Sequence, residues 1–198
     1  RDSTEVVLEE NEYFHPHQGL PENADPEDPA AYEPYTGGQY SHSLIVEEAL
    51  EFVRENAQRP FFLYLPFTIP HLALQVPEEA LAEYLGEFEE TPYTARNGSY
   101  LPHRAPRAAY AAMITLMDSD IGRVMELVQE LGLDENTLFV FTSDNGPSWV
   151  GGVDFEFFGS QGGLRGRKAQ LWEGGIRVPT IARWTGRIES GSVTDIDA

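Results

Sequence analysis

The sequence contains no cysteine among its 198 residues. This absence excludes disulfides, thiolate metal ligands and a cysteine-derived nucleophile within the chain. Long apolar runs are also missing, since none approaches the ~20 residues that a membrane-spanning helix needs. The opening residues, Arg1-Asp2-Ser3-Thr4-Glu5, lack the apolar stretch of a signal peptide. We therefore expect neither disulfides nor a membrane span.

Positive charge is scarce. Thirteen Lys and Arg residues face 33 Asp and Glu residues, which gives a formal net charge of −20. Such a chain repels nucleic acid and anionic membranes at long range, so no nucleic-acid partner is expected. Any site for an anion must then be a local positive pocket inside an acidic surface.

Apolar and aromatic residues are plentiful enough for one domain with a sizeable core. Hydrophobic residues make up 41% of the chain, with 11 Phe, 9 Tyr and 3 Trp, which argues against disorder. Residues 1–40 are predicted to be irregular, because five prolines interrupt any helix and Gly37-Gly38 closes the stretch. Regular structure is predicted from residue 41 onward.

Two long segments have the apolar spacing of an amphipathic helix. The first spans residues 41–57, with Ser41 or Ser43 as its expected N-cap. The second spans residues 106–132, and Gly132 is its expected C-terminal stop. The apolar stripe predicted on this second helix consists of Met113, Leu116, Met117, Val124, Leu127, Val128 and Leu131.

Short apolar runs alternate with these helices. Residues 61–67 and 137–142 are predicted to be buried strands, and residues 176–184 a third strand in which Pro179 is unusual. A short helix is expected over residues 77–86. The order α, β, α, α, β, loop, β predicts an α/β fold, a layered sheet with helices on both faces. Three strands make a thin sheet, so the fold is expected to be incomplete in this chain.

Candidate chemistry begins where the second predicted strand ends, at Ser143-Asp144-Asn145-Gly146. Ligands of open α/β sheets bind beyond the carboxyl ends of strands. Asp144 and Asn145 offer oxygen ligands for a hard cation such as Ca²⁺ or Mg²⁺, although Asp-Asn-Gly is also a common turn signal. His71 follows the first predicted strand in a stiff loop between two prolines, either as a catalytic imidazole or as a surface residue.

One loop gathers the cations. Arg165, Arg167 and Lys168 lie within four residues among glycines whose backbone N–H groups could approach an anion. The alternative is a solvated loop paired to nearby acids. Glu173 and Arg177, a little further on, are interpreted as structural.

The order of these motifs is more specific than any one of them. A strand ending in Pro-His-x5-Pro precedes a long helix and a strand ending in Ser-Asp-Asn-Gly. The sequence Arg-Gly-x-Lys-x4-Glu-Gly-Gly-x-Arg-x-Pro follows. Over about residues 40–188 this succession resembles the sulfatase family of the alkaline-phosphatase-like superfamily. The chain looks most like arylsulfatases and sulfatases of glycosaminoglycan-type sugars, such as N-acetylgalactosamine-6-sulfatase.

The resemblance implies roles for four residues. Asp144 and Asn145 match ligands of a divalent cation, usually Ca²⁺ with Mg²⁺ as the alternative, and Asp144 would also lie near the leaving-group oxygen. Lys168 and His71 match residues that contact the sulfate. The implied activity is hydrolysis of aryl or carbohydrate sulfate esters. The implied partner is a sulfated small molecule or glycan, and the implied compartment is secreted, periplasmic or lysosomal. The resemblance says nothing of the oligomeric state.

Departures from the family pattern matter as much. The formylglycine nucleophile expected in a full-length member arises from Cys/Ser-x-Pro-x-Arg, and this motif, an Asp-Asp pair and a Lys-x-His pair are all missing. Residues 41–198 are therefore expected to be the central part of a sulfatase catalytic domain, without its nucleophile region and C-terminal subdomain. The chain alone is then expected to bind Ca²⁺ weakly and to be inactive. Two alternatives stay open: a phosphodiesterase or phosphonate hydrolase of the same superfamily, and a non-catalytic anion-binding pseudoenzyme.

Overall fold

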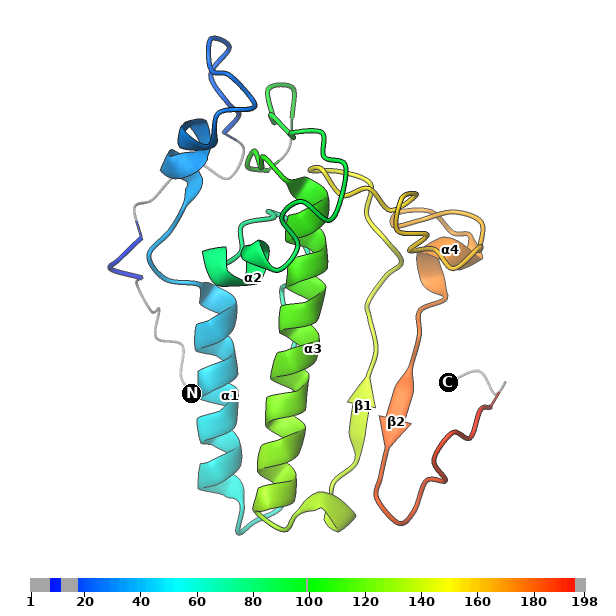
Figure 1. Ribbon diagram of the computed structural model, residues 1–198. Helices are drawn as coiled ribbons and strands as arrows, with labels where there is room; N and C mark the ends of the chain where they lie inside the picture. The colour runs from blue at the N-terminus through cyan, green and yellow to red at the C-terminus, as the bar shows by residue number, and fades with distance from the viewer. Residues whose placement is uncertain (1–7, 12–17, 99, 195–198) are drawn as a thin grey trace.

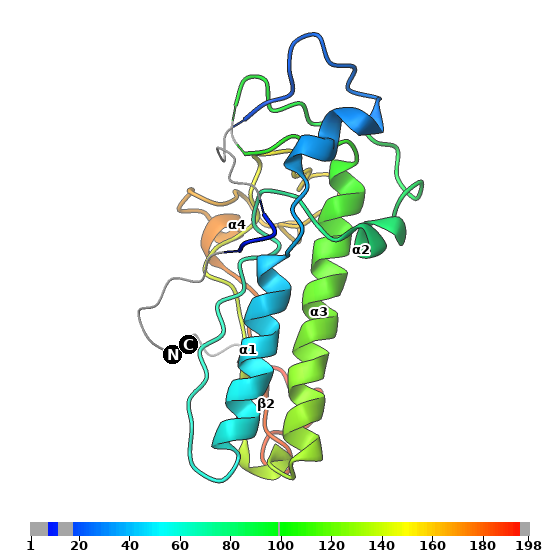
Figure 2. The same ribbon diagram turned by 90° about the vertical axis from the view of Figure 1, so that its left-hand side faces the viewer.

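The computed structural model describes residues 8–11, 18–98 and 100–194. Two long helices dominate it, α1 (Ser41–Asn56) and α3 (Pro106–Glu130), and they lie side by side and run in the same direction (Figures 1 and 2). Each is followed by an extended segment that returns toward the opposite end of the molecule. This helix-down, strand-up order brings the loops after the two returning segments to the same end of the fold.

The remaining elements are short. They are η1 (Pro29–Tyr35), α2 (Glu78–Ala82), η2 (Asp134–Asn136), β1 (Phe139–Phe141), α4 (Glu173–Ile176) and β2 (Ile181–Arg183). β1 and β2 pair antiparallel, with Val140 opposite Ala182. Within the described parts of residues 1–40, η1 is the only regular element, and residues 1–7 and 12–17 of that segment lie outside the described residues.

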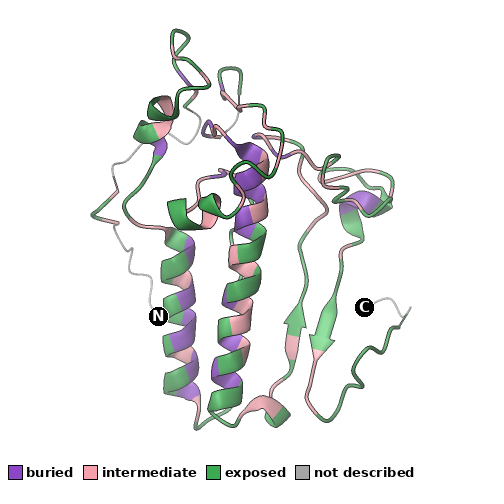
Figure 3. Cartoon of the chain, in the orientation of Figure 1, coloured by how far each residue is buried: buried purple, intermediate pink, exposed green. Residues whose placement is uncertain are grey.

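The core lies between the two long helices, whose buried residues face each other (Figure 3). The buried residues of this cluster are Val46, Leu50, Val53, Val124, Leu127 and Val128. Beside it the fully buried His42 donates from Nε2 to Asp120 Oδ2 at 3.0 Å, which ties α1 to α3. Burial lowers the pKa of His42, so a neutral imidazole fills this position.

The helix predictions are confirmed, with three corrections. The short helix predicted over residues 77–86 spans only Glu78–Ala82. Ser41 and Ser43 are not the N-cap of α1: the cap is Tyr40, which makes no capping hydrogen bond through its side chain. Leu131, predicted in the buried stripe of α3, is 39% exposed because it is already the C-cap residue of the helix. The stop at Gly132 is confirmed, since Gly132 has φ +71° and donates to Gln129 O at 2.9 Å.

The strand predictions need larger corrections. Residues 61–67 are extended but join no β-ladder among the described residues, and Phe62 and Tyr64 are 86% and 75% exposed. Phe61, Leu63, Leu65 and Phe67, which alternate with them, pack on the helix core. The predicted burial of both faces is therefore wrong here. A continuous apolar run is typical of a strand that is buried on both faces. Among the described residues, the helices cover only one face of this segment.

β1 and β2 are also shorter and more exposed than predicted. Phe139 packs on the helix core, whereas Val140 is 59% exposed and Ile181 is 61% exposed. Ile176 belongs to α4 and not to the third predicted strand. Pro179 precedes β2, where its missing N–H removes no ladder bond.

The N-terminus of α3 is capped by a residue from outside the helix. The N-cap residue Ala105 offers no side-chain acceptor, and the Glu90 carboxylate takes its place. It accepts the N–H of Arg107 at 3.1 Å and that of Ala108 at 2.8 Å. A negative charge there also interacts favourably with the helix dipole.

Replacing Glu90 with alanine is expected to lower the free energy of unfolding by about 1 kcal/mol, the usual cost of a lost N-cap. Thermal unfolding followed by circular dichroism measures this loss. Glu89→Ala is the matched control, because the exposed Glu89 side chain makes no hydrogen bond or ion pair in the described residues. Equal unfolding temperatures for the two variants would refute the cap.

Candidate active site

The Asp-Asn turn follows β1 at the loop-rich end of the fold. Asp144 is exposed, and its carboxylate makes no hydrogen bond or ion pair with any described residue. Asn145 donates from Nδ2 to Gly146 O at 3.0 Å, which points its amide nitrogen at the backbone. Its Oδ1 accepts no hydrogen bond from the described part of the chain. Two oxygen donors thus remain available at this turn.

Backbone hydrogen bonds join the Asp-Asn turn to the cationic loop. Gly146 N–H donates to Gly175 O, and Lys168 N–H donates to Pro147 O, each at 3.0 Å. The two backbone segments lie so close together that a Cβ atom at Gly146 would overlap the carbonyl oxygen of Gly174. Lys168 is half-buried, and its ammonium has no partner among the described residues. The fold therefore places an unpaired cation on the loop that adjoins Asp144.

The His71 loop reaches the same region from the first extended segment. The His71 ring is exposed, contacts the Tyr100 ring edge-on at 5.8 Å between centroids, and donates from Nδ1 to Leu72 O at 2.9 Å. Leu72 packs against the backbone of Gly151, in the Gly-rich loop beyond the Asp-Asn turn. With the Nδ1 hydrogen engaged, His71 can donate to an anion from Nε2 only as the imidazolium.

The other residues of the cationic loop are held by aromatic rings and an ion pair. The Arg165 guanidinium lies 3.5 Å from the centroid of the Trp172 ring, and that of Arg167 lies 4.2 Å from the Trp149 ring. Arg177 Nε pairs with Glu173 Oε2 at 2.7 Å, in agreement with a structural role. Among the described residues, no acidic side chain pairs with Arg165, Arg167 or Lys168, so the predicted alternative of a loop paired to nearby acids does not apply to these three cations.

The residues present fit a hard cation in kind but not in number. Asp144 and Asn145 offer two oxygens of the type that Ca²⁺ prefers, whereas Ca²⁺ takes roughly 6–8 oxygen ligands. Residues 8–11, 18–98 and 100–194 contain no group of three or more His, Cys, Asp or Glu side chains that could hold a metal. The described residues can thus form one side of such a site.

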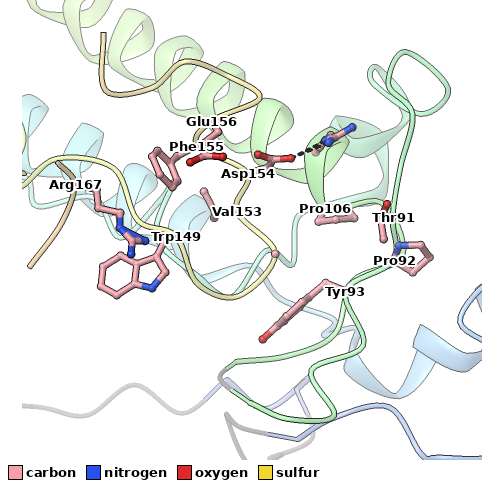
Figure 4. Close-up of a pocket in the computed structure, with 12 residues that line it drawn as sticks. Thr91, Pro92, Tyr93, Pro106, Trp149, Val153, Asp154, Phe155, Glu156 and Arg167 are labelled. Atoms are coloured by element: carbon pink, nitrogen blue, oxygen red, sulfur yellow. Dashed lines mark hydrogen bonds and ion pairs between the residues drawn. The ribbon is translucent and has the colours of Figure 1, made fainter. Parts of the chain in front are cut away.

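A cavity of about 500 Å³ lies beside these loops, and sequence reasoning missed most of its lining (Figure 4). Its principal side chains are Tyr93, Arg107, Trp149, Asp154, Phe155 and Arg167. Trp149 and Arg167 could have been found from the sequence, because they lie within a few residues of Asp144 and Lys168. Tyr93 and Arg107 carried none, because only the tertiary structure brings the segment around residue 93 and the start of α3 to this loop.

Two titratable residues near the cavity have shifted pKa values, which keep Asp154 ionised and His103 neutral. Arg107 Nη2 donates to Asp154 Oδ2 at 2.7 Å, and this hydrogen bond lowers the pKa of Asp154 and keeps the carboxylate ionised. Burial lowers the pKa of His103 to about 4, so its neutral Nδ1 accepts the N–H of Ala105 at 3.1 Å. His103 also exchanges two backbone hydrogen bonds with Tyr93, which fixes that wall of the cavity.

An α/β chain with polar loops gathered beyond its strands has the layout of enzymes whose ligands bind at that edge of the sheet. The sulfatase family model matches residues 6–197. The chain therefore belongs to the sulfatase family, and the family predicted from its motifs is confirmed.

Individual relatives agree with this assignment. The chain is 32% identical to N-acetylgalactosamine-6-sulfatase of Canis lupus familiaris over 80% of its own length and 26% of the relative's. It is 34% identical to steryl-sulfatase of Mus musculus over 75% of this chain and 21% of the relative. It thus spans about a quarter of the length of the curated relatives that it matches.

Solved structures show the same fold. A crystal structure of Ps i-CgsB in complex with k-i-k-neocarrahexaose superposes with a TM-score of 0.62 and 29% identity, covering 77% of this chain and 30% of that one. A glycosaminoglycan-locus protein of Bacteroides thetaiotaomicron, BT33336S-sulf, gives 0.52 and 27%, with 74% and 28% coverage. The predicted α/β fold, incomplete in this chain, is confirmed. No helix among the described residues is long and apolar enough to cross a membrane.

Proposed function

We propose that residues 41–198 are the central part of the catalytic domain of a sulfuric ester hydrolase. The observation that carries the proposal is the 3.0 Å hydrogen bond from Lys168 N–H to Pro147 O. It joins the backbone of the cationic loop to the segment directly after the Asp144-Asn145 turn, and this loop carries three cations in a chain of net charge −20. Membership of the sulfatase family supports the same activity.

Within this proposal each predicted residue has a role that its surroundings allow. Lys168 and His71 bind the sulfate oxygens, because their side chains carry N–H donors toward which negative charge can move during S–O cleavage. Asp144 and Asn145 hold one side of the cation through Oδ atoms that have no partner in the described chain. Asp144 also lies near the leaving-group oxygen, where a carboxyl group can deliver a proton.

The remaining requirements lie outside these residues. A bound Ca²⁺, or Mg²⁺ in its place, would add positive charge at the sulfate oxygens. The formylglycine nucleophile would come from a preceding region of a full-length enzyme. The substrate is proposed to be a sulfated sugar or aryl sulfate, in line with relatives named N-acetylgalactosamine-6-sulfatase and steryl-sulfatase. A secreted, periplasmic or lysosomal compartment remains a prediction from the family.

The activity is tested on this chain and on a version extended to the full length of its relatives. The extended enzyme is expected to hydrolyse 4-nitrophenyl sulfate and to lose that activity in a calcium chelator, while the 198-residue chain alone is inactive. The measurement is nitrophenolate release with and without added Ca²⁺. Faster cleavage of bis(4-nitrophenyl) phosphate would favour the phosphodiesterase alternative. Binding of sulfate without turnover would favour the non-catalytic one.

A further inference from the structure

Two contacts orient the exposed imidazole of His71. Its Nδ1 donates to Leu72 O at 2.9 Å, and its ring meets the Tyr100 ring edge-on, with centroids 5.8 Å apart and planes at 73°. Leu72 belongs to the same loop as His71, whereas Tyr100 comes from a separate segment of the chain. An edge-on arrangement is one of the preferred geometries of two aromatic rings, so Tyr100 restricts how the imidazole can turn.

The backbone of Tyr100 is held in an unfavourable conformation. Its φ of +72° lies in the left-handed region, which bulky residues rarely adopt and which suits glycine or asparagine. The backbone geometry therefore does not favour a tyrosine at this position. Strained residues persist where the surrounding contacts hold them, and they gather at functional sites. The ring is what a tyrosine adds here, and this ring lies against His71.

The segment that carries this tyrosine is docked on the loop that carries the histidine. Leu101 is buried in an apolar cluster on which Ala73 packs. Pro102 O accepts a hydrogen bond from Gln75 Nε2 at 3.0 Å. Ala73 and Gln75 both follow the histidine in its own loop. The contact between the two rings is therefore supported by packing and by a hydrogen bond between the segments, and it does not depend on two exposed side chains alone.

We propose that Tyr100 is a positioning residue, whose ring holds the His71 imidazole in the orientation that binds the sulfate. With Nδ1 engaged by Leu72 O, Nε2 is the ring nitrogen left for an anion. A donor that is already oriented needs no reorganisation when negative charge develops on the sulfate oxygens, and a small misplacement of such a group is costly to the rate. The inference rests on the proposed function, because it takes His71 as a sulfate-binding residue.

The first test uses the chain extended to the full length of its relatives. Tyr100→Leu is expected to lower kcat/KM for 4-nitrophenyl sulfate by about 3–10-fold, the effect of one lost aromatic pair. Tyr100→Phe keeps the ring and should retain most of the activity. Tyr100→Asn removes the ring but suits the left-handed backbone, so it should lose the same activity without a lower unfolding temperature.

A double-mutant cycle separates positioning from a general structural role. If Tyr100 acts through His71, then Tyr100→Leu should leave kcat/KM unchanged once His71 has been replaced with alanine, because the group that it orients is gone. A tyrosine that only supports the loop would lower the activity by the same factor in both backgrounds. Thermal unfolding of each variant shows that the compared proteins are folded.

A second readout does not depend on the reaction. In NMR spectra of the 198-residue chain, the His71 ring protons are identified by their loss in His71→Ala, and they should carry a ring-current shift that Tyr100→Phe keeps and Tyr100→Leu removes.

The inference is overturned if this shift is the same in Tyr100→Leu as in the wild type, or if Tyr100→Leu costs the same activity with and without His71. The proposed function fails by a different result, in which the extended chain hydrolyses no sulfate ester or His71→Ala is as active as the wild type. The NMR shift then still decides whether Tyr100 orients the imidazole.

Discussion

Replacing Lys168 with alanine in the chain extended to the full length of its relatives is expected to lower kcat/KM for 4-nitrophenyl sulfate by about 10²–10³-fold, the usual cost of one preorganised charge-stabilising donor. The backbone of Lys168 is hydrogen-bonded to Pro147, next to the Asp144-Asn145 turn, and its ammonium has no partner among the described residues. Its removal therefore leaves the charge that develops on the sulfate oxygens without this donor.

The same substitution should leave the unfolding temperature almost unchanged, because the ordering hydrogen bond of Lys168 uses its backbone N–H and not its side chain. Arg165→Ala serves as the charge-matched control and should retain most of the activity. An unchanged kcat/KM in Lys168→Ala would contradict the assigned role.

A second measurement uses the composition of the chain. Lys168 is the only lysine in the sequence, so an amine-acylating reagent modifies it and the terminal amine alone. Inorganic sulfate is expected to slow acylation of Lys168 and not that of the terminus, which mass spectrometry of the digested chain resolves. Equal rates with and without sulfate would argue against an anion at this residue.

Replacing Gly146 with alanine is expected to lower the free energy of unfolding by about 2–3 kcal/mol, typical of forced overpacking. The new methyl group would overlap the backbone oxygen of Gly174, and a backbone cannot turn aside as a flexible side chain can. The variant must then separate the Asp-Asn turn from the cationic loop, losing the bonds from Gly146 to Gly175 and from Lys168 to Pro147. Chemical denaturation measures the loss of stability.

Gly122→Ala is the control for Gly146→Ala, and it is expected to raise the free energy of unfolding. Gly122 lies inside α3, with nothing within 4 Å of an added Cβ, so alanine should stabilise the protein by roughly 0.5–1 kcal/mol. If Gly146→Ala proved as harmless as Gly122→Ala, the close docking of the two loops would be disproved.

The docked loops concentrate positive charge on one part of an acidic protein. The formal charge of −20 belongs to the whole chain, whereas Arg165, Arg167 and Lys168 lie on one loop. Arg165 and Arg167 rest on the rings of Trp172 and Trp149, which neutralise none of their charge. The positive potential is therefore confined to this loop. The small number of Lys and Arg residues in the sequence predicted such a local positive region.

Local patterns in the sequence determined the helices and the candidate residues. The spacing of apolar residues and the stop at Gly132 predicted α1 and α3 because helical contacts join residues three or four apart. The succession of His71, the Asp144-Asn145 turn and Lys168 predicted the family, since each motif is a short contiguous stretch. The sequence alone also determined the net charge and the absence of a nucleophile motif.

The tertiary structure decided how these pieces meet. Strand pairing and the exposure of residues 61–67 depend on which elements cover each face, which no local pattern encodes. The neighbours of Lys168 and the wall formed by Tyr93 and Arg107 depend on contacts between segments tens of residues apart. The sequence thus named the chemical groups, while the docking of Gly146 against Gly174 and Gly175 brought the turn and the cationic loop together, because only a chain without a side chain at residue 146 can approach so closely.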